Sequence, residues 1–233
     1  MKTALLFDLD NTLLNDQQAK EKYLPAVYRK FSYINNVSFD EFRARWYQGI
    51  EKYIPLCESG YLTFEQQQRI RLEEAFSVKG LSDELINEYY MEITKEYEKN
   101  FVLVDNAIQV LNELKEKNTL ALVSNGSSVQ QWKKIRKFNL QSYFEVIIIS
   151  QDVNVAKPNK EIFELAMAQC KSIGQNNYFI GDDFENDIKG SYNAGLIPIW
   201  YNTTNRKPND TKVEYFEINN LNKIQGIVES MHS

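Results

Sequence analysis

The sequence predicts an α/β protein with a mostly parallel sheet, into which a bundle of four helices is inserted. Three observations support this prediction. An apolar run, Ala4 to Phe7, leads directly into a cluster of carboxylates. The segment 15–100 shows helical periodicity of its apolar residues. From about Phe101 onward, β-rich segments alternate with helical ones. Strands that alternate with helices of roughly ten residues or more are typical of a parallel sheet with crossover connections.

The first strand is predicted to be buried on both faces, because it is a short, continuous apolar run that ends in polar residues. Asp8 and Asp10 follow it at spacing i, i+2. Successive side chains of a strand alternate faces, so both carboxylates emerge on one side at its C-terminal end. Ligands of open α/β sheets bind at that end. Two carboxylates so close repel each other unless a cation or a proton lies between them. An Asp-Asn turn is the ordinary alternative.

Amphipathic stripes and capping residues predict the four helices of the insert. The stripe of the first helix consists of Leu24, Val27, Tyr28 and Phe31. This i, i+3, i+4, i+7 spacing places its residues on one helix face. Ser38, Thr63 and Ser82 are predicted to begin the next three helices, and Thr63 with Gln66 has the spacing of a capping box. Short connections between the helices favour an antiparallel bundle.

The second half of the chain carries the other strands of the sheet. Strands are predicted at 119–123, 145–149, 178–180 and 196–200, and helices at 105–117, 127–138, 159–171 and 185–193. The segment 202–210 is predicted to be a loop, and the last twenty residues a strand or turn followed by a short helix.

Polar residues follow each of these predicted strands. After the second strand, Ser124, Asn125 and a glycine begin a helix, which is typical of a phosphate cradle or of an ordinary N-cap. After the third strand comes Lys157, held on a stiff segment by the proline that follows it. A lysine is more often simply solvated. With the acids after the first strand and after the fourth strand, four strand ends carry acid, hydroxyl, lysine and acid, which favours a shared site over chance.

After the fourth strand comes the acidic segment Gly181-Asp182-Asp183-Phe184-Glu185-Asn186-Asp187. Carboxylates at a helix start complement the helix dipole, so a purely structural role is possible. Directly after a buried strand, however, Asp182, Asp183 and Asp187 are also the oxygen ligands that a hard cation requires.

Composition excludes several other classes of protein. The net charge of −5 and the absence of a basic block argue against a nucleic-acid polymer as partner. No apolar run is long enough to span a membrane. Cys57 and Cys170 lack metal-ligand spacing, and we expect both to pack as small apolar residues in a reducing cytoplasm. The sole histidine is His232, which argues against chemistry based on histidine.

These motifs, in this order, resemble those of the haloacid dehalogenase-like (HAD) hydrolase superfamily. The four motifs are Asp8-Leu9-Asp10-Asn11-Thr12, Ser124-Asn125, Lys157-Pro158 and Gly181-Asp182-Asp183 with Asp187. The resemblance implies a Rossmann-like, doubly wound core formed by residues 1–14 and 101–233, with the insert 15–100 as a helical cap. The segment from Ser150 to Lys160 resembles the branch that holds pyrimidine 5′-nucleotidases and N-acylneuraminate-9-phosphatase.

The resemblance also implies a role for each residue. Asp8 is the expected nucleophile and Asp10 the expected general acid and base. The Asp8 carboxylate, the Asp10 carbonyl and Asp182 are the expected Mg²⁺ ligands. Thr12, Ser124, Asn125 and Lys157 are expected to bind the phosphoryl oxygens. Asp187 is expected to support metal-bound water or to orient its neighbours, and Asp183 stands where relatives often have Ser or Thr.

The expected activity is phosphate-monoester hydrolysis by a monomer or weak homodimer, with a 5′-nucleotide as substrate. A dehalogenase needs no leaving-group acid, so Asp10 argues against it. A phosphomutase, a sugar-phosphate phosphatase of the acylneuraminate type and a non-catalytic phosphate sensor are the alternatives. Substrate choice is expected to lie in the cap, which holds fifteen of the thirty aromatic residues. These form either a stacking surface for a base or, more commonly, the core of the bundle. Arg43 and Arg45 either contact a sugar or base or, more commonly, face solvent.

Overall fold

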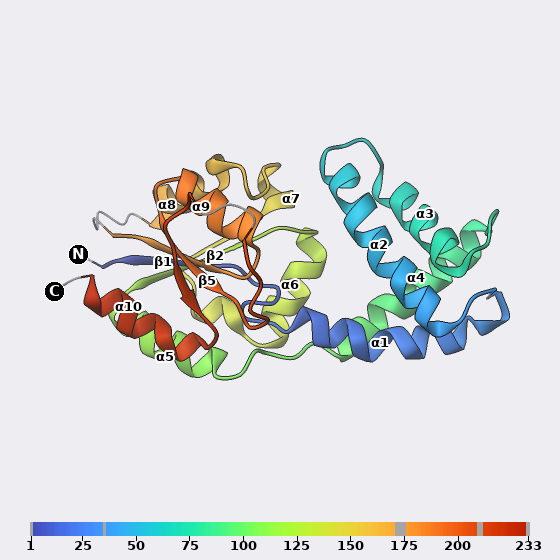
Figure 1. The fold of residues 1–233 in the computed structure, drawn as a ribbon, viewed down its shortest axis with the longest axis horizontal. Coiled ribbons are helices and arrows are strands. Elements are labelled where there is room, and N and C mark those ends of the chain that lie inside the picture. Colours follow the sequence, from blue (N-terminus) through green and yellow to red (C-terminus); the bar gives the residue numbers. More distant parts are fainter. Residues whose placement is uncertain (1, 35, 171–175, 209–211, 232–233) are drawn as a thin grey trace. The chain divides into compact units, whose positions relative to one another are not determined.

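The computed structural model describes residues 2–34, 36–170, 176–208 and 212–231 (Figure 1). His232 and Lys171, the expected end of one helix, lie outside these ranges. The chain divides into two compact units. The core unit comprises residues 1–16 and 102–233, and the helical unit comprises residues 17–101. That the helical unit acts as a cap stays a prediction.

A six-stranded parallel sheet forms the centre of the core unit. Its strands are β1 (Ala4–Phe7), β2 (Thr119–Ser124), β3 (Val146–Ile149), β4 (Tyr178–Gly181), β5 (Ile197–Tyr201) and β6 (Phe216–Ile218). Their order is β3-β2-β1-β4-β5-β6, and all five neighbouring pairs are parallel. This order is that of a Rossmann-like, doubly wound sheet. The predicted α/β fold is therefore confirmed.

Helices cover both faces of this sheet. They are α5 (Ala107–Lys117), α6 (Ser128–Lys137), α7 (Ser150–Val153), α8 (Lys160–Cys170), α9 (Gly190–Asn193) and α10 (Ile224–Ser230), with short 3-10 turns at Leu140–Ser142 and Leu221–Lys223. Figure 1 shows α8 and α9 on one face and α5 and α10 on the other. Burial on both faces explains why the strands are almost continuously apolar.

The core between the sheet and α8 is built from the strands' inward-facing residues. Leu6 of β1 packs with Val123 of β2 and with Phe163 of α8, and all three are fully buried. Cys170 belongs to the same cluster, and burial raises the pKa of its thiol to about 11. It packs as a small apolar residue, as expected, whereas Cys57 is only half-buried.

The predicted helix at 185–193 differs from the structure in its first half. Phe184–Lys189 forms a π-helix, and only Gly190–Asn193 (α9) is α-helical. The wider turn is visible in the bond of 3.2 Å from the N–H of Ile188 to the carbonyl of Asp183, five residues earlier. The wide turn lies in the segment that carries Asp187. Such bulges often occur at functional sites.

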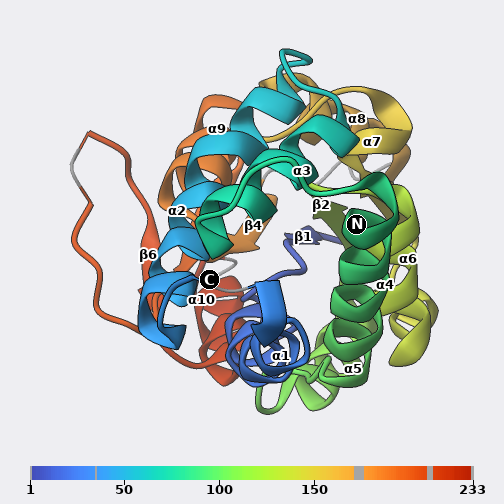
Figure 2. The same ribbon diagram turned by 90° about the vertical axis from the view of Figure 1, so that its right-hand side faces the viewer.

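The helical unit is built from α1 (Asp16–Lys30), α2 (Phe39–Glu58), α3 (Phe64–Phe76) and α4 (Asp83–Lys99), with a 3-10 turn at Ser32–Ile34. The first residue of α1 belongs to the core unit. Ser38 and Thr63 cap α2 and α3 in full capping boxes, and Ser82 caps α4. These helix starts confirm the predictions from the sequence. Figure 2 shows α2 and α3 side by side. None of the described helices has the length and apolarity needed to cross a membrane.

Many of the aromatic residues of the helical unit lie in its core. Phe42, Trp46 and Tyr89 are at most 1 % exposed and contact one another or Phe76 through their rings. Tyr61, by contrast, is 83 % exposed. The core interpretation is therefore confirmed for Trp46, as it is for the buried Tyr53. Arg43 lies on the surface in an ion pair with Glu21.

The two chain segments that join the units are adjacent within the core unit. The N–H of Asn15 donates to the carbonyl of Val102 and the N–H of Val104 to that of Leu13, each at 2.9 Å. Leu14 and Leu103 form an antiparallel bridge. The chain therefore leaves the core and returns to it at neighbouring points, which makes the helical unit an insertion.

Candidate active site

The predicted site residues lie at the carboxyl ends of the strands. Asp8 follows β1 directly, and its N–H donates to the carbonyl of Ile180 in β4 at 2.9 Å. Ser124 is the last residue of β2, and Asp182 comes directly after β4. All strands are parallel, so these ends share one edge of the sheet. The chain runs from β1 through β2 to β3 on one side of β1, and then crosses to β4 on the other side. This reversal is the switch point at which such folds bind ligands.

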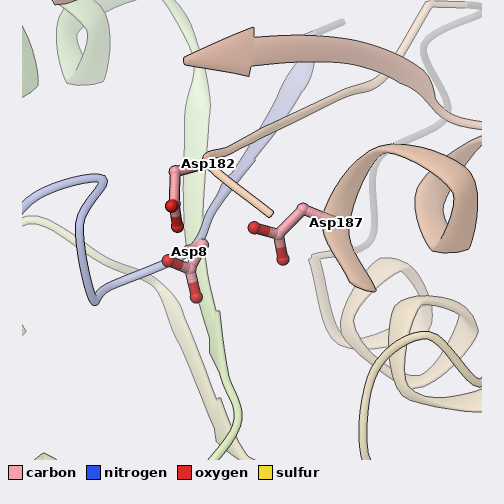
Figure 3. A group of neighbouring side chains, drawn as sticks. All are labelled: Asp8, Asp182 and Asp187. Atoms are coloured by element: carbon pink, nitrogen blue, oxygen red, sulfur yellow. The ribbon is translucent and has the colours of Figure 1, made fainter. Parts of the chain in front are cut away.

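Three carboxylates meet at this edge. Each of Asp8, Asp182 and Asp187 offers an oxygen atom, and these atoms all lie within 4.8 Å of one another. Figure 3 shows the three side chains pointing toward a common centre. Asp8 and Asp187 are almost fully buried. The sequence analysis placed Asp187 in a supporting role, and the structure places it in this group.

Lys157 is the cation inside the cluster. Its Nζ donates to Oδ1 of Asp8 at 2.6 Å and to Oδ1 of Asp187 at 2.7 Å. Its side chain is buried, and its peptide bond to Pro158 is cis. Burial works against a charged ammonium, but the carboxylates of Asp187 and Asp8 outweigh it and raise the pKa of Lys157. The lysine is therefore held charged beside the expected nucleophile.

One lysine does not neutralise three carboxylates. Burial is the main cause that raises the pKa of Asp8, and the nearby charges of Asp187 and Asp182 add to it against the effect of Lys157. Burial and the charge of Asp187 raise the pKa of Asp182 to about 7. Burial likewise raises the pKa of Asp187. The cluster holds more negative charge than its protein surroundings stabilise.

This cluster fits a hard divalent cation. The donors are all carboxylate oxygens, which Mg²⁺ prefers, and a divalent cation would offset the repulsion among them. Asp8, Asp182 and Asp187 would hold such an ion. The carbonyl of Asp10 as a further ligand stays a prediction.

Asp182 has two further contacts, neither of which was anticipated from the sequence. Its carbonyl accepts bonds from Nε1 of Trp200 at 2.9 Å and from the guanidinium of Arg206 at 2.7 Å. The same guanidinium lies 3.3 Å from Oδ2 of Asp182. Both contacts come from β5 and from the loop that follows it, so this part of the chain fixes the position of Asp182.

The carboxylate of Asp10 is held by a different part of the core unit. Nζ of Lys134 lies 2.7 Å from its Oδ1 and 2.8 Å from its Oδ2, and Nε2 of Gln131 donates to Oδ2 at 2.9 Å. Both partners belong to α6. Asp8 and Asp10 therefore have separate surroundings although only one residue stands between them.

The hydroxyl of Thr12 is a clear candidate for binding an oxygen atom of a ligand. Thr12 is fully buried, and its hydroxyl has no hydrogen-bond partner among the described residues. A buried hydroxyl without a partner carries a free-energy cost, which a bound oxygen atom would relieve. This fits the expected role of Thr12 at a phosphoryl group.

Ser124 and Asn125 follow β2 but point to different partners. Nδ2 of Asn125 donates to the carbonyl of Lys157 at 2.9 Å, and its Oδ1 accepts from the N–H of Lys157 at 2.8 Å. Asn125 thus fixes the backbone that carries Lys157. The hydroxyl of Ser124 accepts from Nε2 of Gln131 at 2.7 Å.

Asp183 lies beside the cluster but serves the local backbone. Its Oδ1 accepts from the N–H of Asn186 at 2.8 Å and so caps the π-helix. Its own N–H donates to Oδ2 of Asp187 at 3.0 Å. Gly181 lets Asp187 approach, because a Cβ at Gly181 would lie 2.5 Å from Cγ of Asp187. The acidic motif therefore combines two carboxylates of the cluster, Asp182 and Asp187, with one helix cap, Asp183.

The sequence analysis missed Gln131 and Lys134. Both are at most 2 % exposed, which is unusual for these residue types. Their spacing of i, i+3 just after the Ser124-Asn125-Gly126 turn was the available signal. Polar residues on the helix face that turns toward a strand end are candidates for the site.

Comparison with known proteins agrees with this geometry. Residues 5–201 match the family model described as haloacid dehalogenase-like hydrolase. Pyrimidine 5′-nucleotidase YjjG of Escherichia coli is 26 % identical over 229 residues, which cover 96 % of each chain. N-acylneuraminate-9-phosphatase of Mus musculus is 25 % identical over 241 residues, which cover 98 % of this chain and 94 % of that protein.

A solved structure agrees with the fold. The crystal structure of the HAD-hydrolase YfnB from Bacillus subtilis bound to magnesium aligns with a TM-score of 0.80 at 26 % identity, over 97 % of this chain and 98 % of that one. The family match covers most of the chain, and the sheet order and the acidic cluster are in accord with it. This chain therefore belongs to the haloacid dehalogenase-like hydrolase family.

Proposed function

We propose that this protein is a Mg²⁺-dependent phosphatase that hydrolyses small phosphate monoesters through an aspartyl-phosphate on Asp8. The observation that carries the proposal is the contact of Asp8 with Lys157 inside the carboxylate cluster, with Asp10 two residues further on. A buried carboxylate beside a charged lysine is a nucleophile placed where a phosphoryl group meets positive charge.

The first half-reaction transfers the phosphoryl group to the enzyme. An oxygen of Asp8 attacks phosphorus and forms a new P–O bond, while the bond from phosphorus to the ester oxygen breaks. Asp10 gives its proton to the leaving oxygen, so the alcohol departs neutral. Its ionised carboxylate is then ready to act as a base.

The second half-reaction hydrolyses the intermediate. Asp10 takes a proton from water, whose oxygen attacks phosphorus as the bond to Asp8 breaks. The products are inorganic phosphate, the free Asp8 carboxylate and a protonated Asp10. When bound, Mg²⁺ supplies charge compensation for the phosphoryl oxygens and for the cluster.

Lys157, Thr12 and Ser124 are proposed to bind the phosphoryl oxygens. In the transition state, charge is spread over these oxygens, so several donors must act together. The loss of one preorganised donor of this kind raises a reaction barrier by about 3–4 kcal/mol. Asn125 contributes by holding Lys157 in place.

Nucleoside 5′-monophosphates are the proposed substrates, with pyrimidine ones preferred. The support is the similarity to the E. coli protein named pyrimidine 5′-nucleotidase over nearly the full length of both chains. The helical unit is proposed to act as the cap that selects the leaving group. The second candidate is a sugar phosphate of the acylneuraminate type, favoured by the similarity to the mouse protein.

A panel of phosphate monoesters assayed with Mg²⁺ tests the proposal. We expect nucleoside 5′-monophosphates to be hydrolysed faster than hexose or acylneuraminate phosphates. Activity should vanish in a chelator and return with Mg²⁺, but return poorly with Ca²⁺, whose looser coordination misplaces the nucleophile. Full turnover in metal-free buffer would contradict the proposed dependence on Mg²⁺. A preference for acylneuraminate phosphates would contradict the nucleotidase assignment.

A further inference from the structure

Two residues of α6, Gln131 and Lys134, contact the carboxylate of Asp10. Lys134 contacts both of its oxygens, at 2.7 and 2.8 Å, and Gln131 contacts Oδ2 at 2.9 Å. Lys134 also lies 3.9 Å from Asp16, where α1 begins. Three polar contacts on one short side chain leave it few alternative rotamers.

Burial differs sharply between Asp10 and these partners. The side chain of Asp10 is 27 % exposed, whereas that of Lys134 is 3 % exposed. Gln131 is 1 % exposed. The partners therefore cover the protein side of the carboxylate and leave its other side open. An open side is what a group needs if it must exchange a proton with a ligand or with water.

Gln131 also connects Asp10 to the predicted phosphate-binding turn. Its Nε2 lies 2.7 Å from Oγ of Ser124 and 3.0 Å from the carbonyl of Asn125. Gly126 makes room for this amide: its φ is +134°, and a Cβ there would lie 3.3 Å from Cδ of Gln131. The buried side chain of Gln131 thus contacts both Ser124, at the end of β2, and Asp10, which follows β1.

We propose that Lys134 and Gln131 are positioning residues that fix the Asp10 carboxylate in the orientation from which it exchanges protons. The inference rests on the proposed function, because it assigns the two residues to the general acid and base of that reaction. A proton is transferred efficiently only within hydrogen-bond reach and in good alignment. A carboxylate that rotates freely loses this alignment although the residue itself is intact.

The alternative is that Lys134 and Gln131 serve only the stability of the fold. If the two residues position Asp10, the activity lost on their substitution should depend on the leaving group of the substrate. If they only stabilise the fold, it should not. An alkyl ester needs a proton on its departing oxygen, whereas p-nitrophenolate leaves without one. Hydrolysis of the aspartyl-phosphate requires Asp10 as a base for either ester.

The test compares Lys134→Met and Gln131→Met with the control Lys133→Met, which makes the same chemical change at the exposed neighbouring residue. We expect kcat of Lys134→Met to fall about 100-fold for the alkyl ester that the wild type hydrolyses best, with little change in KM. With p-nitrophenyl phosphate, the first turnover should stay within about threefold of the wild type. Steady-state turnover should then drop as the phosphoenzyme accumulates, which acid quench and mass spectrometry detect.

Gln131→Met should show the same pattern more weakly, because Lys134 remains, and it supplies the test if Lys134→Met fails to fold. The inference is overturned if folded variants match Lys133→Met, or if first-turnover and steady-state rates for both esters fall in equal proportion. Wild-type protein without any turnover in Mg²⁺ would reject the proposed function and this inference together. Wild-type turnover with unaffected α6 variants would reject the positioning role alone.

Discussion

Asp8 and Asp10 show how two like residues acquire different chemistry from their surroundings. Asp8 is buried between Asp182, Asp187 and Lys157, in a group of carboxylates around one ammonium. Asp10 is partly exposed and is held by Lys134 and Gln131, both on α6. A pair of carboxylates in distinct environments is a common basis for dividing nucleophile and acid–base roles.

Replacing either acid by its amide should abolish turnover without unfolding the protein. In Asp8→Asn the amide does not attack phosphorus, and in Asp10→Asn it does not transfer the proton, so we expect kcat to fall by about a thousandfold or more. Steady-state phosphatase assays and thermal unfolding measure the two effects. Asp183→Asn is the matched control, because asparagine caps a helix as well as aspartate does. Substantial turnover by Asp8→Asn would rule out the covalent route.

The stability of the metal-free protein should fall as the pH rises from about 4 to about 7. The pKa of Asp182 is raised from its ordinary value of 3.8 to about 7, so in this window the native state binds a proton that the unfolded state has lost. Below the pKa of the unfolded state, such a group does not change the free energy of unfolding. Above the pKa of the native state, it lowers the free energy of unfolding by its full amount. A shift of about three pKa units corresponds to at most about 4 kcal/mol.

Thermal unfolding in a chelator across this pH range measures the effect. Asp182→Asn should flatten the profile, because the amide does not titrate. Mg²⁺ should do the same near pH 7, since it binds the ionised cluster and stabilises the native state. A melting temperature that rises steadily with pH in the chelator would contradict the assignment.

At the scale of elements, the acidic motif works because β4 ends in a glycine. In Gly181→Ala the new Cβ would lie 2.5 Å from Cγ of Asp187, so this side chain must move away from Lys157. We expect a loss of about 2 kcal/mol or more in the free energy of unfolding, together with a large loss of activity. Denaturant titration and turnover measure the two losses.

Gly226→Ala is the matched substitution, with the opposite expected effect on the free energy of unfolding. This glycine lies inside α10, and nothing lies within 4 Å of the position of its missing Cβ. Alanine is favoured over glycine inside a helix by about 0.5–1 kcal/mol, so the protein should become slightly more stable and stay fully active. Equal effects of the two substitutions would show that the approach of Asp187 is unimportant.

Most elements and most site residues could be predicted because the local pattern determines them. The apolar runs specify the buried strands, and a polar residue after a parallel strand must lie at the shared edge. The π-helix at Phe184–Lys189 was not predicted, since its apolar pattern resembles that of an α-helix. This segment carries Asp187, whose contact with Lys157 is a tertiary interaction that the sequence does not reveal locally.

The contacts of Asp10 and Asp182 were unpredictable for the same reason. Lys134 and Arg206 lie far along the chain from their carboxylate partners, and lysines and arginines are usually solvated. Only the three-dimensional fold brings these pairs together. Asn125 is a partial case: its place after β2 was predicted, but its two bonds to the backbone of Lys157 were not.

For the molecule as a whole, residues 17–101 are inserted at one point of the core unit. All the residues assigned to the reaction belong to the core unit, and the chain leaves and re-enters it along the paired segments at Leu14 and Leu103. A core unit that contacts only the phosphate group of a substrate does not distinguish one leaving alcohol from another. The helical unit is therefore the proposed source of substrate preference.

Replacing residues 17–101 by a short Gly-Ser linker should leave a folded core unit, because the two ends are already adjacent. Hydrolysis of p-nitrophenyl phosphate should persist at a reduced rate, since an activated ester needs little remote binding energy. The ranking among natural monoesters should collapse. Circular dichroism, the monoester panel and an Asp8→Asn version of the same core measure these outcomes. A preserved ranking would place specificity in the core unit instead.

The position of β1 at the centre of the sheet also has a consequence during translation. Leu5 pairs with Leu120 on one side and with Tyr178 on the other, so the ribosome makes the strand long before either neighbour. At typical rates of synthesis, β1 waits about 10 to 30 seconds for its second partner. The helical unit, a continuous segment, is complete well before that time. A nascent chain therefore carries a complete helical unit while β1 is still unpaired. The N–H of Asp8 gains its partner, the carbonyl of Ile180, only when β4 emerges.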